Sequence, residues 1–280
     1  MAGEKVSLLL PCLSVFACNS LMYLFCQAKK DNSYIDVWWG LSFVVPNAAL
    51  IALQRHAGHT IDPRTVLINL LVSAWGLRLA WHIGKRHKEE DYRYKAMRDR
   101  WEAKGKAYYY FASFMYVFMM QALFGLIVNG ATLYITANSA ATGAAGLIWT
   151  DYLGLGVATT GLAIETIADW QLTKHISNKD PKKGKFCQNG LWRYSRHPNY
   201  FGEVVVWWGV WITACSVPGG LTTIYAPSFI TWLLLRLSGV PLLEKKQRLH
   251  PEWKAYEDKT SKFVPWFPKD STTATNKKLN

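Results

Sequence analysis

Long apolar runs separated by short basic loops constrain this chain more than any other feature of its sequence. A helix needs about 20 apolar residues to cross a hydrocarbon core of about 30 Å. A soluble helical bundle would instead carry polar stripes, and segments such as 109–128 show almost none. The runs lie at about 6–26, 36–54, 65–83, 110–136, 148–171, 199–217 and 220–243. The sequence therefore predicts an all-α polytopic integral membrane protein with about seven transmembrane helices.

The basic residues predict how the chain is oriented in the membrane. With the N-terminus outside, the inside loops and tail hold 27 Lys and Arg and the outside loops hold 3. This asymmetry is what the positive-inside rule describes. The net charge of +13 therefore reflects topology, and nucleic-acid binding is excluded as its explanation. The C-terminus is predicted on the positive, cytosolic or matrix-like face, and the endoplasmic reticulum, the mitochondrial inner membrane and a bacterial inner membrane are not distinguished.

The chain shows no internal repeat or linker, and the sequence predicts a single membrane domain over 1–280. The first apolar run has no small-x-small cleavage site behind it, so it is interpreted as a span rather than a signal peptide. A polar C-terminal tail is expected at 269–280. No metal site is predicted, because His56 and His59 stand in a short outside loop without a third ligand.

Several charged residues lie within the apolar runs or at their edges. Charges in a span cost at least a few kcal/mol and usually mark function. Snorkelling to the headgroups is the alternative, but the short carboxylates snorkel poorly. Glu165 and Asp169 are four residues apart and share a helix face, and so do Asn199 and Glu203. We expect the two pairs to face each other and to form a polar pocket at the inner leaflet.

The stretch Gly190–Glu203 is unusually polar for the start of an apolar run. Pro198 suits the first turn of a helix, so the sixth span is predicted to begin there, at the inner surface. Helix N-termini bind anions through free N–H groups and the helix dipole.

The side chains around this helix start fit an anionic, nucleotide-like ligand. Positive charge comes from Arg193, Arg196 and His197. Hydrogen-bonding groups follow one turn deeper at Asn199, Tyr200 and Glu203. Positive-inside charge explains the arginines but not the polar groups behind them. The sequence therefore predicts a cofactor site at this point.

Several sequence blocks together resemble the steroid 5-alpha-reductase C-terminal superfamily, most closely an uncharacterised branch of membrane reductase-like proteins. The resemblance covers about 30–268. Its blocks are Ser33–Gly40, Trp75–Arg78, Glu90–Tyr94, Ile164–Gln171, Gly190–Glu203 and Ser238–Lys245.

The resemblance implies a seven-helix membrane oxidoreductase that reduces an activated C=C bond with NADPH. In such enzymes hydride passes from the nicotinamide to one carbon, and an acid protonates the other carbon or the conjugated carbonyl. By position, Asp169, Asn199 and Glu203 match cofactor contacts of steroid reductases, and Arg78 aligns with an arginine of their cofactor pocket. The related block of sterol C14-reductases matches Tyr194, Arg196, His197 and Tyr200.

The chain departs from the steroid reductases where they hold the 3-keto oxygen of the substrate. Trp38 and Trp39 stand where a Gln-Glu pair is expected, and Trp75 stands where the next span carries a tyrosine. A steroid substrate is therefore not implied, and no catalytic proton donor is assigned. Aromatic walls favour a flat or extended apolar substrate that enters from the bilayer, of sterol, prenyl or fatty-chain type.

Two alternatives remain open from the sequence. The pattern around Arg196, His197 and Pro198 also resembles isoprenylcysteine carboxyl and phospholipid methyltransferases, which bind S-adenosylmethionine. A non-catalytic subunit that kept this fold within a larger membrane assembly is the third reading, favoured by the missing acid. Membrane lipids are expected partners in all three cases.

We expect the loops 84–109 and 172–198 and the C-terminus on one side of the membrane, because the 27-to-3 charge split requires it. The test places single cysteines at positions 140 and 180 of a variant that lacks the five native cysteines. An impermeant maleimide should reach the two positions from opposite sides. Labelling of both from the same side contradicts the topology.

Overall fold

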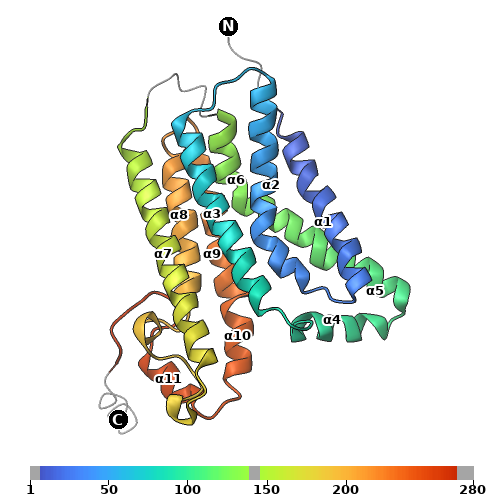
Figure 1. Ribbon diagram of the computed structural model, residues 1–280, viewed down its shortest axis with the longest axis vertical. Coiled ribbons are helices and arrows are strands. Elements are labelled where there is room, and N and C mark those ends of the chain that lie inside the picture. Colours follow the sequence, from blue (N-terminus) through green and yellow to red (C-terminus); the bar gives the residue numbers. More distant parts are fainter. Residues whose placement is uncertain (1–6, 139–145, 270–280) are drawn as a thin grey trace. The chain divides into compact units, whose positions relative to one another are not determined.

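A computed structural model describes residues 7–138 and 146–269, and within these ranges it contains helices and no β-strand (Figure 1). The predicted all-α class is therefore confirmed. Contacts divide the chain into two compact units, 1–152 with 210–226, and 153–209 with 227–280. Apart from Lys269, the predicted polar tail 269–280 lies outside the described residues.

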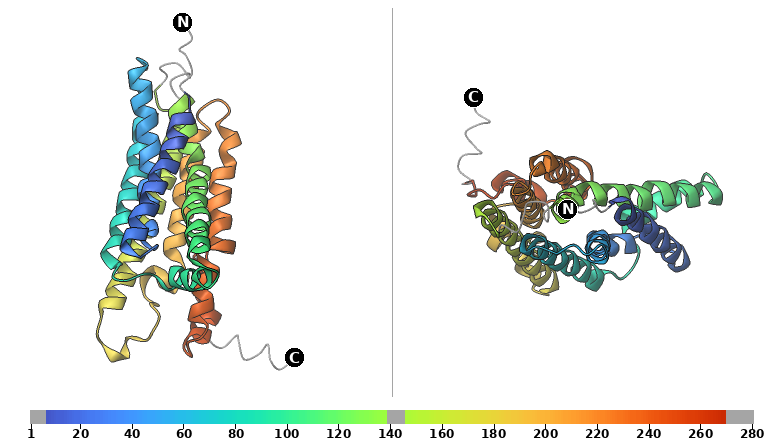
Figure 2. Two further views of the ribbon diagram at one scale, coloured as in Figure 1. Left: turned by 90° about the vertical axis from the view of Figure 1, so that its right-hand side faces the viewer. Right: turned by 90° about the horizontal axis from the view of Figure 1, so that it is seen from above.

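The first unit is built from long helices and one short transverse helix. Figure 2 shows α1, α2 and α3 running lengthwise beside one another, whereas α4 lies across their ends (Figure 1). A six-residue π-helix, η1, joins α5 to α6 in one continuous helix, Lys106–Asn138. The bounds are α1 Leu9–Lys29, α2 Tyr34–His56, α3 Pro63–Arg86, α4 Tyr92–Glu102, α5 Lys106–Ser113, η1 Phe114–Met119 and α6 Met120–Asn138.

Close backbone contact fixes α2 against α3. A Cβ atom placed on Gly40 would lie 2.2 Å from the carbonyl oxygen of Gly76, and one on Gly76 would lie 2.3 Å from that of Gly40. Only glycine allows this approach, so both crossing positions are sterically fixed. These two glycines belong to two of the sequence blocks that carried the family resemblance.

Polar side chains fix α2 against α6. Asn47 and Asn129 exchange amide hydrogen bonds of 3.3 and 3.1 Å, and seven residues later Gln54 Nε2 donates to the Thr136 carbonyl oxygen at 2.5 Å. Both pairs are separated by 82 residues, so the two helices run in the same direction with a constant register. In an apolar surrounding such bonds add specificity to helix packing.

The second unit contains two long helices followed by shorter segments. A π-helical segment, η6, lies between α9 and α10, and two 3₁₀ turns, η3 and η4, precede α8. The bounds are α7 Trp149–Ser177, η3 Pro181–Lys183, η4 Gly190–Arg193, α8 Pro198–Ala214, α9 Tyr225–Trp232, η6 Leu233–Leu237, α10 Val240–Gln247 and α11 Trp253–Lys259. The predicted start of α8 at Pro198 is confirmed.

Small residues bring α7 and α8 into direct backbone contact. A Cβ on Gly161 would lie 2.5 Å from the Val206 amide nitrogen, and one on Gly202 would lie 2.6 Å from the Glu165 amide nitrogen. At Gly209 the nearest atom is the Ala158 amide nitrogen, at 2.3 Å. The contact therefore extends along several turns of both helices (Figure 1).

Five helical segments among the described residues are long and apolar enough to cross a membrane, as expected of an integral membrane protein. They are Leu9–Lys29, Tyr34–His56, Pro63–Arg86, Lys106–Asn138 and Gly220–Gln247. The two other predicted runs, at about 148–171 and 199–217, are also helical, in α7 and α8. However, α8 has 17 residues, and α7 carries acidic residues along its length. The count of seven spans stays a prediction.

We expect Gly161→Ala to lower the melting temperature of the protein, because the new methyl group must push α7 from α8. Overpacking of this kind typically costs about 1–3 kcal/mol. Gly156 lies on the same helix, and a Cβ there meets no atom within 4 Å. Gly156→Ala should therefore leave the melting temperature unchanged or raise it, since alanine favours helix. Thermal unfolding in detergent measures both; equal effects of the two substitutions would contradict the packing argument.

Candidate functional site

The segment before α8 is held against α7 by a tight turn. Gly190 has a φ of +61°, and a Cβ there would lie 2.2 Å from Gln171 Nε2. Glycine is therefore favoured by the backbone conformation, and a larger residue would also displace the Gln171 side chain. The next residue, Leu191, donates its N–H to Gln171 Oε1 at 2.9 Å. Trp192 then buries its ring and donates Nε1–H to the Ala168 carbonyl oxygen at 2.9 Å.

The C-terminal segment covers the other side of this loop. Ser195 Oγ donates to the Phe263 carbonyl oxygen at 2.7 Å, and the Arg196 N–H donates to that of Ser261 at 2.9 Å. The Trp266 N–H in turn donates to the Tyr194 carbonyl oxygen at 2.9 Å. The loop that leads into α8 is thus ordered by elements on both sides, which gives α8 a defined starting point.

Arg196 directs its guanidinium into the protein. Nε and Nη2 contact Glu244 Oε1 at 3.0 and 2.8 Å, while Nη1 donates to the Glu257 and Thr260 carbonyl oxygens at 3.0 and 2.8 Å. The side chain is 6% exposed and also lies over the Trp253 ring, with Cζ 5.5 Å from its centroid. Arg196 was predicted to bind an anionic ligand, but its guanidinium instead donates hydrogen bonds to α10 and to the C-terminal end of α11.

Glu244 is the residue at this site that sequence reasoning missed. Its carboxylate is buried and contacts Arg196, His197 Nε2 at 3.2 Å and Arg248 Nη2 at 3.4 Å. The available signal was a glutamate in the Ser238–Lys245 block, at the end of an apolar run. That position did not show that Glu244 would meet Arg196 and His197, because these two lie in the loop before α8, far from Glu244 in the sequence.

His197 is placed by Glu244 and by Tyr200. Burial lowers the pKa of the imidazole below its usual value, although the Glu244 carboxylate acts in the opposite direction. A neutral ring donates Nε2–H to Glu244, which fixes the tautomer. The ring also stacks on Tyr200, with centroids 5.8 Å apart and planes 11° apart. His197 is thus a buried group fixed by Glu244 and Tyr200 rather than a freely available cation at the surface.

The predicted facing of α7 and α8 carboxylates and amides is present. Asn199 Nδ2 donates to Asp169 Oδ1 at 3.1 Å. Glu165, Asp169 and Glu203 are all buried, with 3%, 5% and 6% exposure. The close glycine contact between the helices places this polar face one to two turns inside α8. Polar side chains are costly to bury in an apolar surrounding. Here α7 and α8 bury Asp169 and Asn199 together, so the two side chains can hydrogen-bond to each other.

The side-chain oxygen of Asn199, Oδ1, is an acceptor that the described residues leave unused. Because Nδ2 is bound to Asp169, the amide orientation is set and Oδ1 points elsewhere as an acceptor. Oδ1 is buried and has no hydrogen-bond partner among the described residues. Buried acceptors are almost always satisfied, so this oxygen can accept a hydrogen bond from an N–H or O–H group beyond the described residues.

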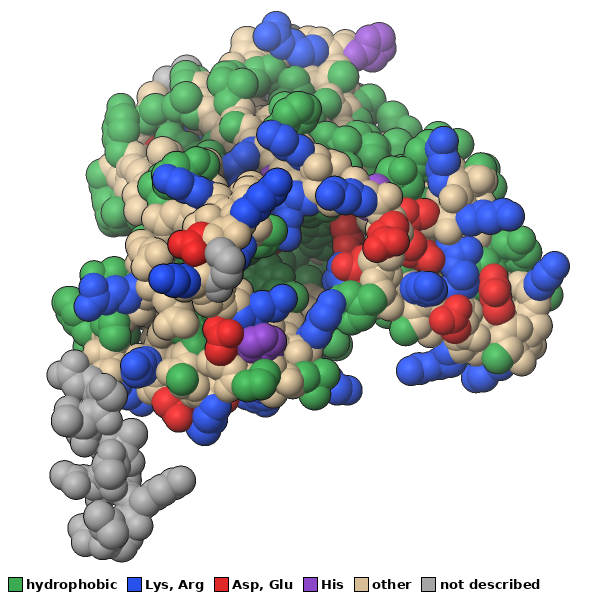
Figure 3. Space-filling view, turned by 60° about the horizontal axis from the view of Figure 1, so that its bottom comes forward, with side chains coloured by type: hydrophobic (Ala, Val, Ile, Leu, Met, Phe, Trp, Pro, Cys, Tyr) green, Lys and Arg blue, Asp and Glu red, His purple; other side chains and the backbone are tan. Residues whose placement is uncertain are grey.

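The other predicted cofactor residues take different positions. Arg193 is exposed, and Tyr194 packs its ring against Phe267 at 6.2 Å. Lys183 caps the end of α7, donating Nζ–H to the His175 and Asn178 carbonyl oxygens at 2.8 and 2.5 Å. Lysines and arginines gather at this end of the second unit (Figure 3). Arg78 lies on α3 of the first unit, so the contacts within the second unit do not include it.

The tryptophans that replace polar groups form part of the first unit's core. Trp75 is fully buried and meets Phe43 edge to face at 5.1 Å, and Phe43 meets Trp39 at 5.2 Å. Trp38 is half-buried, and its Nε1 has no hydrogen-bond partner among the described residues. No group of three His, Cys, Asp or Glu in the described ranges is arranged to hold a metal ion.

Comparison with known proteins identifies the family. Residues 22–260 match the family described as "Protein of unknown function (DUF1295)". The chain belongs to the DUF1295 family. This family stands in the steroid 5-alpha-reductase-like group, as the sequence blocks predicted. The matched range contains every predicted cofactor residue from Arg78 to Glu203.

A similar protein is known from fission yeast. "Uncharacterized protein C594.04c" of Schizosaccharomyces pombe is 24% identical over 270 residues, which cover 84% of this chain and 73% of that protein. No solved structure matches the chain significantly. The family and the relative therefore support the fold group and carry no statement about activity.

We expect Arg196→Met to unfold the second unit at much lower temperature than the wild type. The substitution removes the guanidinium from the buried Glu244 carboxylate and from two carbonyl oxygens at the end of α11, and breaking such a buried pair costs about 3–5 kcal/mol. The matched control, Arg193→Met, removes an exposed charge and should change stability by less than about 0.5 kcal/mol. Thermal unfolding in detergent compares the two; similar stability of both variants would show that Arg196 does not hold the segments together.

Proposed function

We propose that this protein is a membrane-embedded, NADPH-dependent reductase of a C=C bond in a lipophilic substrate, with seven membrane-spanning helices. The resemblance of its sequence blocks to membrane reductases suggests the reaction. The observation that carries the proposal is Asn199, which holds a buried acceptor oxygen on the face that matches cofactor contacts in steroid reductases.

The residues around Asn199 suit the polar parts of a dinucleotide. The Asn199 Oδ1 acceptor is complementary to a carboxamide N–H or a ribose hydroxyl. Asp169 fixes the amide, and the buried Glu203 lies one turn further along the same face of α8. When bound, the nicotinamide group would supply the hydride. The chain's own residues would orient that group and exclude water from it.

The phosphates of a dinucleotide need positive charge that is not already committed. Arg196 and Lys183 are bound to acceptors of the chain itself, so they are not the phosphate ligands of this proposal. Arg193 is exposed beside the start of α8, and exposed lysines lie in the last turn of α7 at Lys174 and after α7 at Lys179, Lys182 and Lys185. We assign the phosphate contacts to Arg193 and to these lysines.

The expected substrate is lipid-soluble. Five apolar helices give it access from the bilayer, and in the sequence Trp38, Trp39 and Trp75 stand where steroid reductases carry the polar groups that hold a keto oxygen. An unsaturated sterol, prenyl or fatty chain is therefore more suitable than a 3-keto steroid.

One observation favours a second candidate, an S-adenosylmethionine-dependent methyltransferase. Three buried carboxylates, Glu165, Asp169 and Glu203, lie on the α7–α8 face, and negative charge attracts a cationic ligand. S-adenosylmethionine carries a sulfonium and no phosphate. Under this reading Asn199 Oδ1 accepts a hydrogen bond from its ammonium or ribose group.

We expect Asn199→Ala to weaken NADPH binding about tenfold, since a buried hydrogen bond to a ligand contributes about 1–3 kcal/mol. Asn189→Ala is the matched control, because Asn189 is an exposed asparagine at the start of η4 with no side-chain capping bond. Isothermal titration calorimetry on both variants and the wild type measures the Kd, and thermal unfolding verifies that each variant is folded.

The same titrations separate the candidate functions. Binding of NADPH in preference to NADH and S-adenosylmethionine supports the reductase. Binding of S-adenosylmethionine alone, weakened by Asn199→Ala, replaces it with the methyltransferase. Absence of binding to all three, together with a fixed set of co-purifying membrane proteins, replaces both with the non-catalytic subunit. Oxidation of bound NADPH by a panel of unsaturated lipids then identifies the substrate class.

A further inference from the structure

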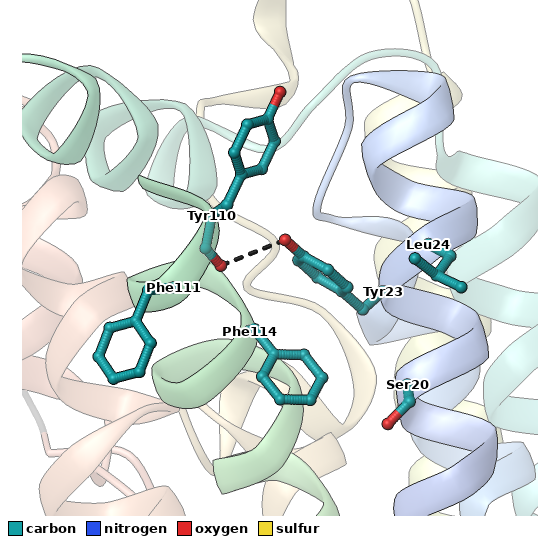
Figure 4. A pocket seen from close by; sticks show the side chains of 6 residues that line it. All are labelled: Ser20, Tyr23, Leu24, Tyr110, Phe111 and Phe114. Atoms are coloured by element: carbon teal, nitrogen blue, oxygen red, sulfur yellow. Dashed lines mark hydrogen bonds between the residues drawn. The ribbon is translucent and has the colours of Figure 1, made fainter. Parts of the chain in front are cut away.

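A groove in the first unit lies apart from the candidate cofactor site. It has a volume of about 410 Å³ and opens between α1 and the α5–η1 segment (Figure 4). Ser20, Tyr23 and Leu24 line one wall, and Tyr110, Phe111 and Phe114 line the other. Its surface is almost entirely apolar, so it suits a hydrocarbon chain rather than a polar molecule.

The floor of this groove is held in place by Tyr23. The Tyr23 hydroxyl donates to the Tyr110 carbonyl oxygen at 3.2 Å (Figure 4). Its ring meets Phe114 and Phe118 edge to face, with centroids 5.1 and 5.3 Å apart. The one polar group on the floor is therefore satisfied, and the aromatic rings are fixed before any ligand arrives. The groove is preformed, which lowers the entropic cost of filling it.

The groove also coincides with a break in regular helix. Phe114 is the first residue of the π-helix Phe114–Met119. A π-segment inside an α-helix is uncommon and is frequently found at functional sites. Tyr110 and Phe111 precede this segment by four and three residues, so they share one helix face with Phe114 on the groove wall, and the π-segment begins at the end of that face.

The surrounding helices make the bilayer the source of the occupant. Both α1 and Lys106–Asn138 are apolar enough to span a membrane. Leu24 and Phe111 at the rim are 62% and 60% exposed, so the groove opens toward the lipid-facing side of these helices. An acyl chain of a membrane lipid is the group of matching polarity that the bilayer supplies.

Two lysines at one end of the groove favour lipids with an anionic headgroup. Lys106 precedes Tyr110 by four residues and shares its face of α5. Lys30 ends α1 seven residues after Tyr23, and both lysine side chains are exposed. At 1.5 Å per residue they lie about 6 and about 10 Å along their helices from the aromatic floor. That separation fits a headgroup phosphate above an inserted chain.

We propose that this groove binds one acyl chain of an anionic phospholipid, whose phosphate is contacted by Lys106 and Lys30. The inference does not rest on the proposed reductase function, because none of the residues involved belongs to the cofactor site. The bound lipid fills the space between α1 and α5–η1, and we expect it to stabilise their packing. Phosphatidylglycerol is the probe, and phosphatidylcholine with the same acyl chains is the neutral comparison.

Native mass spectrometry of the detergent-purified full chain measures how many lipids remain bound as each phospholipid is titrated. We expect the wild type to prefer phosphatidylglycerol about tenfold, because each lysine near an anionic headgroup contributes appreciably to binding. In Lys30→Gln/Lys106→Gln this preference should fall to about onefold. The control Lys88→Gln/Lys95→Gln removes the same charge from exposed positions elsewhere in the first unit and should keep the preference.

A second variant tests the apolar wall. Ser20→Phe places a ring in the groove and should weaken the binding of both phospholipids, and Leu24→Ala replaces it if thermal unfolding shows that Ser20→Phe is not folded. Equal binding of the two phospholipids to the wild type would overturn the proposal. So would a preference that survives the double lysine substitution, or displacement of phosphatidylglycerol by cholesterol at equal concentration, which would indicate a sterol groove instead.

Discussion

The buried pair of Arg196 and Glu244 is the interaction on which the second unit depends. One guanidinium binds the α10 carboxylate and two carbonyl oxygens at the end of α11, and its own backbone N–H binds the segment behind α11. A lysine ammonium could not reach these acceptors in the same planar arrangement. Burying two charges costs several kcal/mol unless the remaining donors are satisfied, and here four short contacts satisfy them. The pair therefore sets the position from which α8 begins.

This use of Arg196 changes what the start of α8 can bind. A basic cluster beside a helix N-terminus suggests an anion site, but a guanidinium bound to a buried carboxylate contributes little free positive charge. The groups turned away from this pair are Asn199, Asp169 and Glu203, one turn deeper. Arg196 is thus better described as the residue that positions Asn199 than as a ligand of the phosphates. In the proposed cofactor complex, exposed residues such as Arg193 would meet the charge on the ligand.

The helical architecture followed from the sequence because apolar length acts over whole segments. Each of the seven apolar runs is mostly helical in its described part, and α8 begins at Pro198 as the helix-start rule requires. The contact between Asp169 and Asn199 was also predicted. Each belongs to a pair of polar residues spaced four apart, and that spacing defines a helix face. The sequence did not predict which side chains from different segments would contact each other. Periodicity gives the buried face but not the neighbour, so neither Glu244 beside Arg196 nor the π-helix from Phe114 was predictable.

The sequence blocks that carried the family resemblance have a common physical role, which explains why they could be recognised without a structure. Gly40 and Gly76 come from two blocks and form the α2–α3 crossing, while Gly202 closes the α7–α8 crossing beside Glu165. In a membrane, where apolar side chains gain little from helix contact, close backbone approach and a few buried hydrogen bonds supply the specificity. Such positions tolerate few residue types, whereas lipid-facing ones tolerate many. Recognisable motifs therefore concentrate at the crossings, and the same crossings bring the polar residues Asp169 and Asn199 within hydrogen-bonding distance.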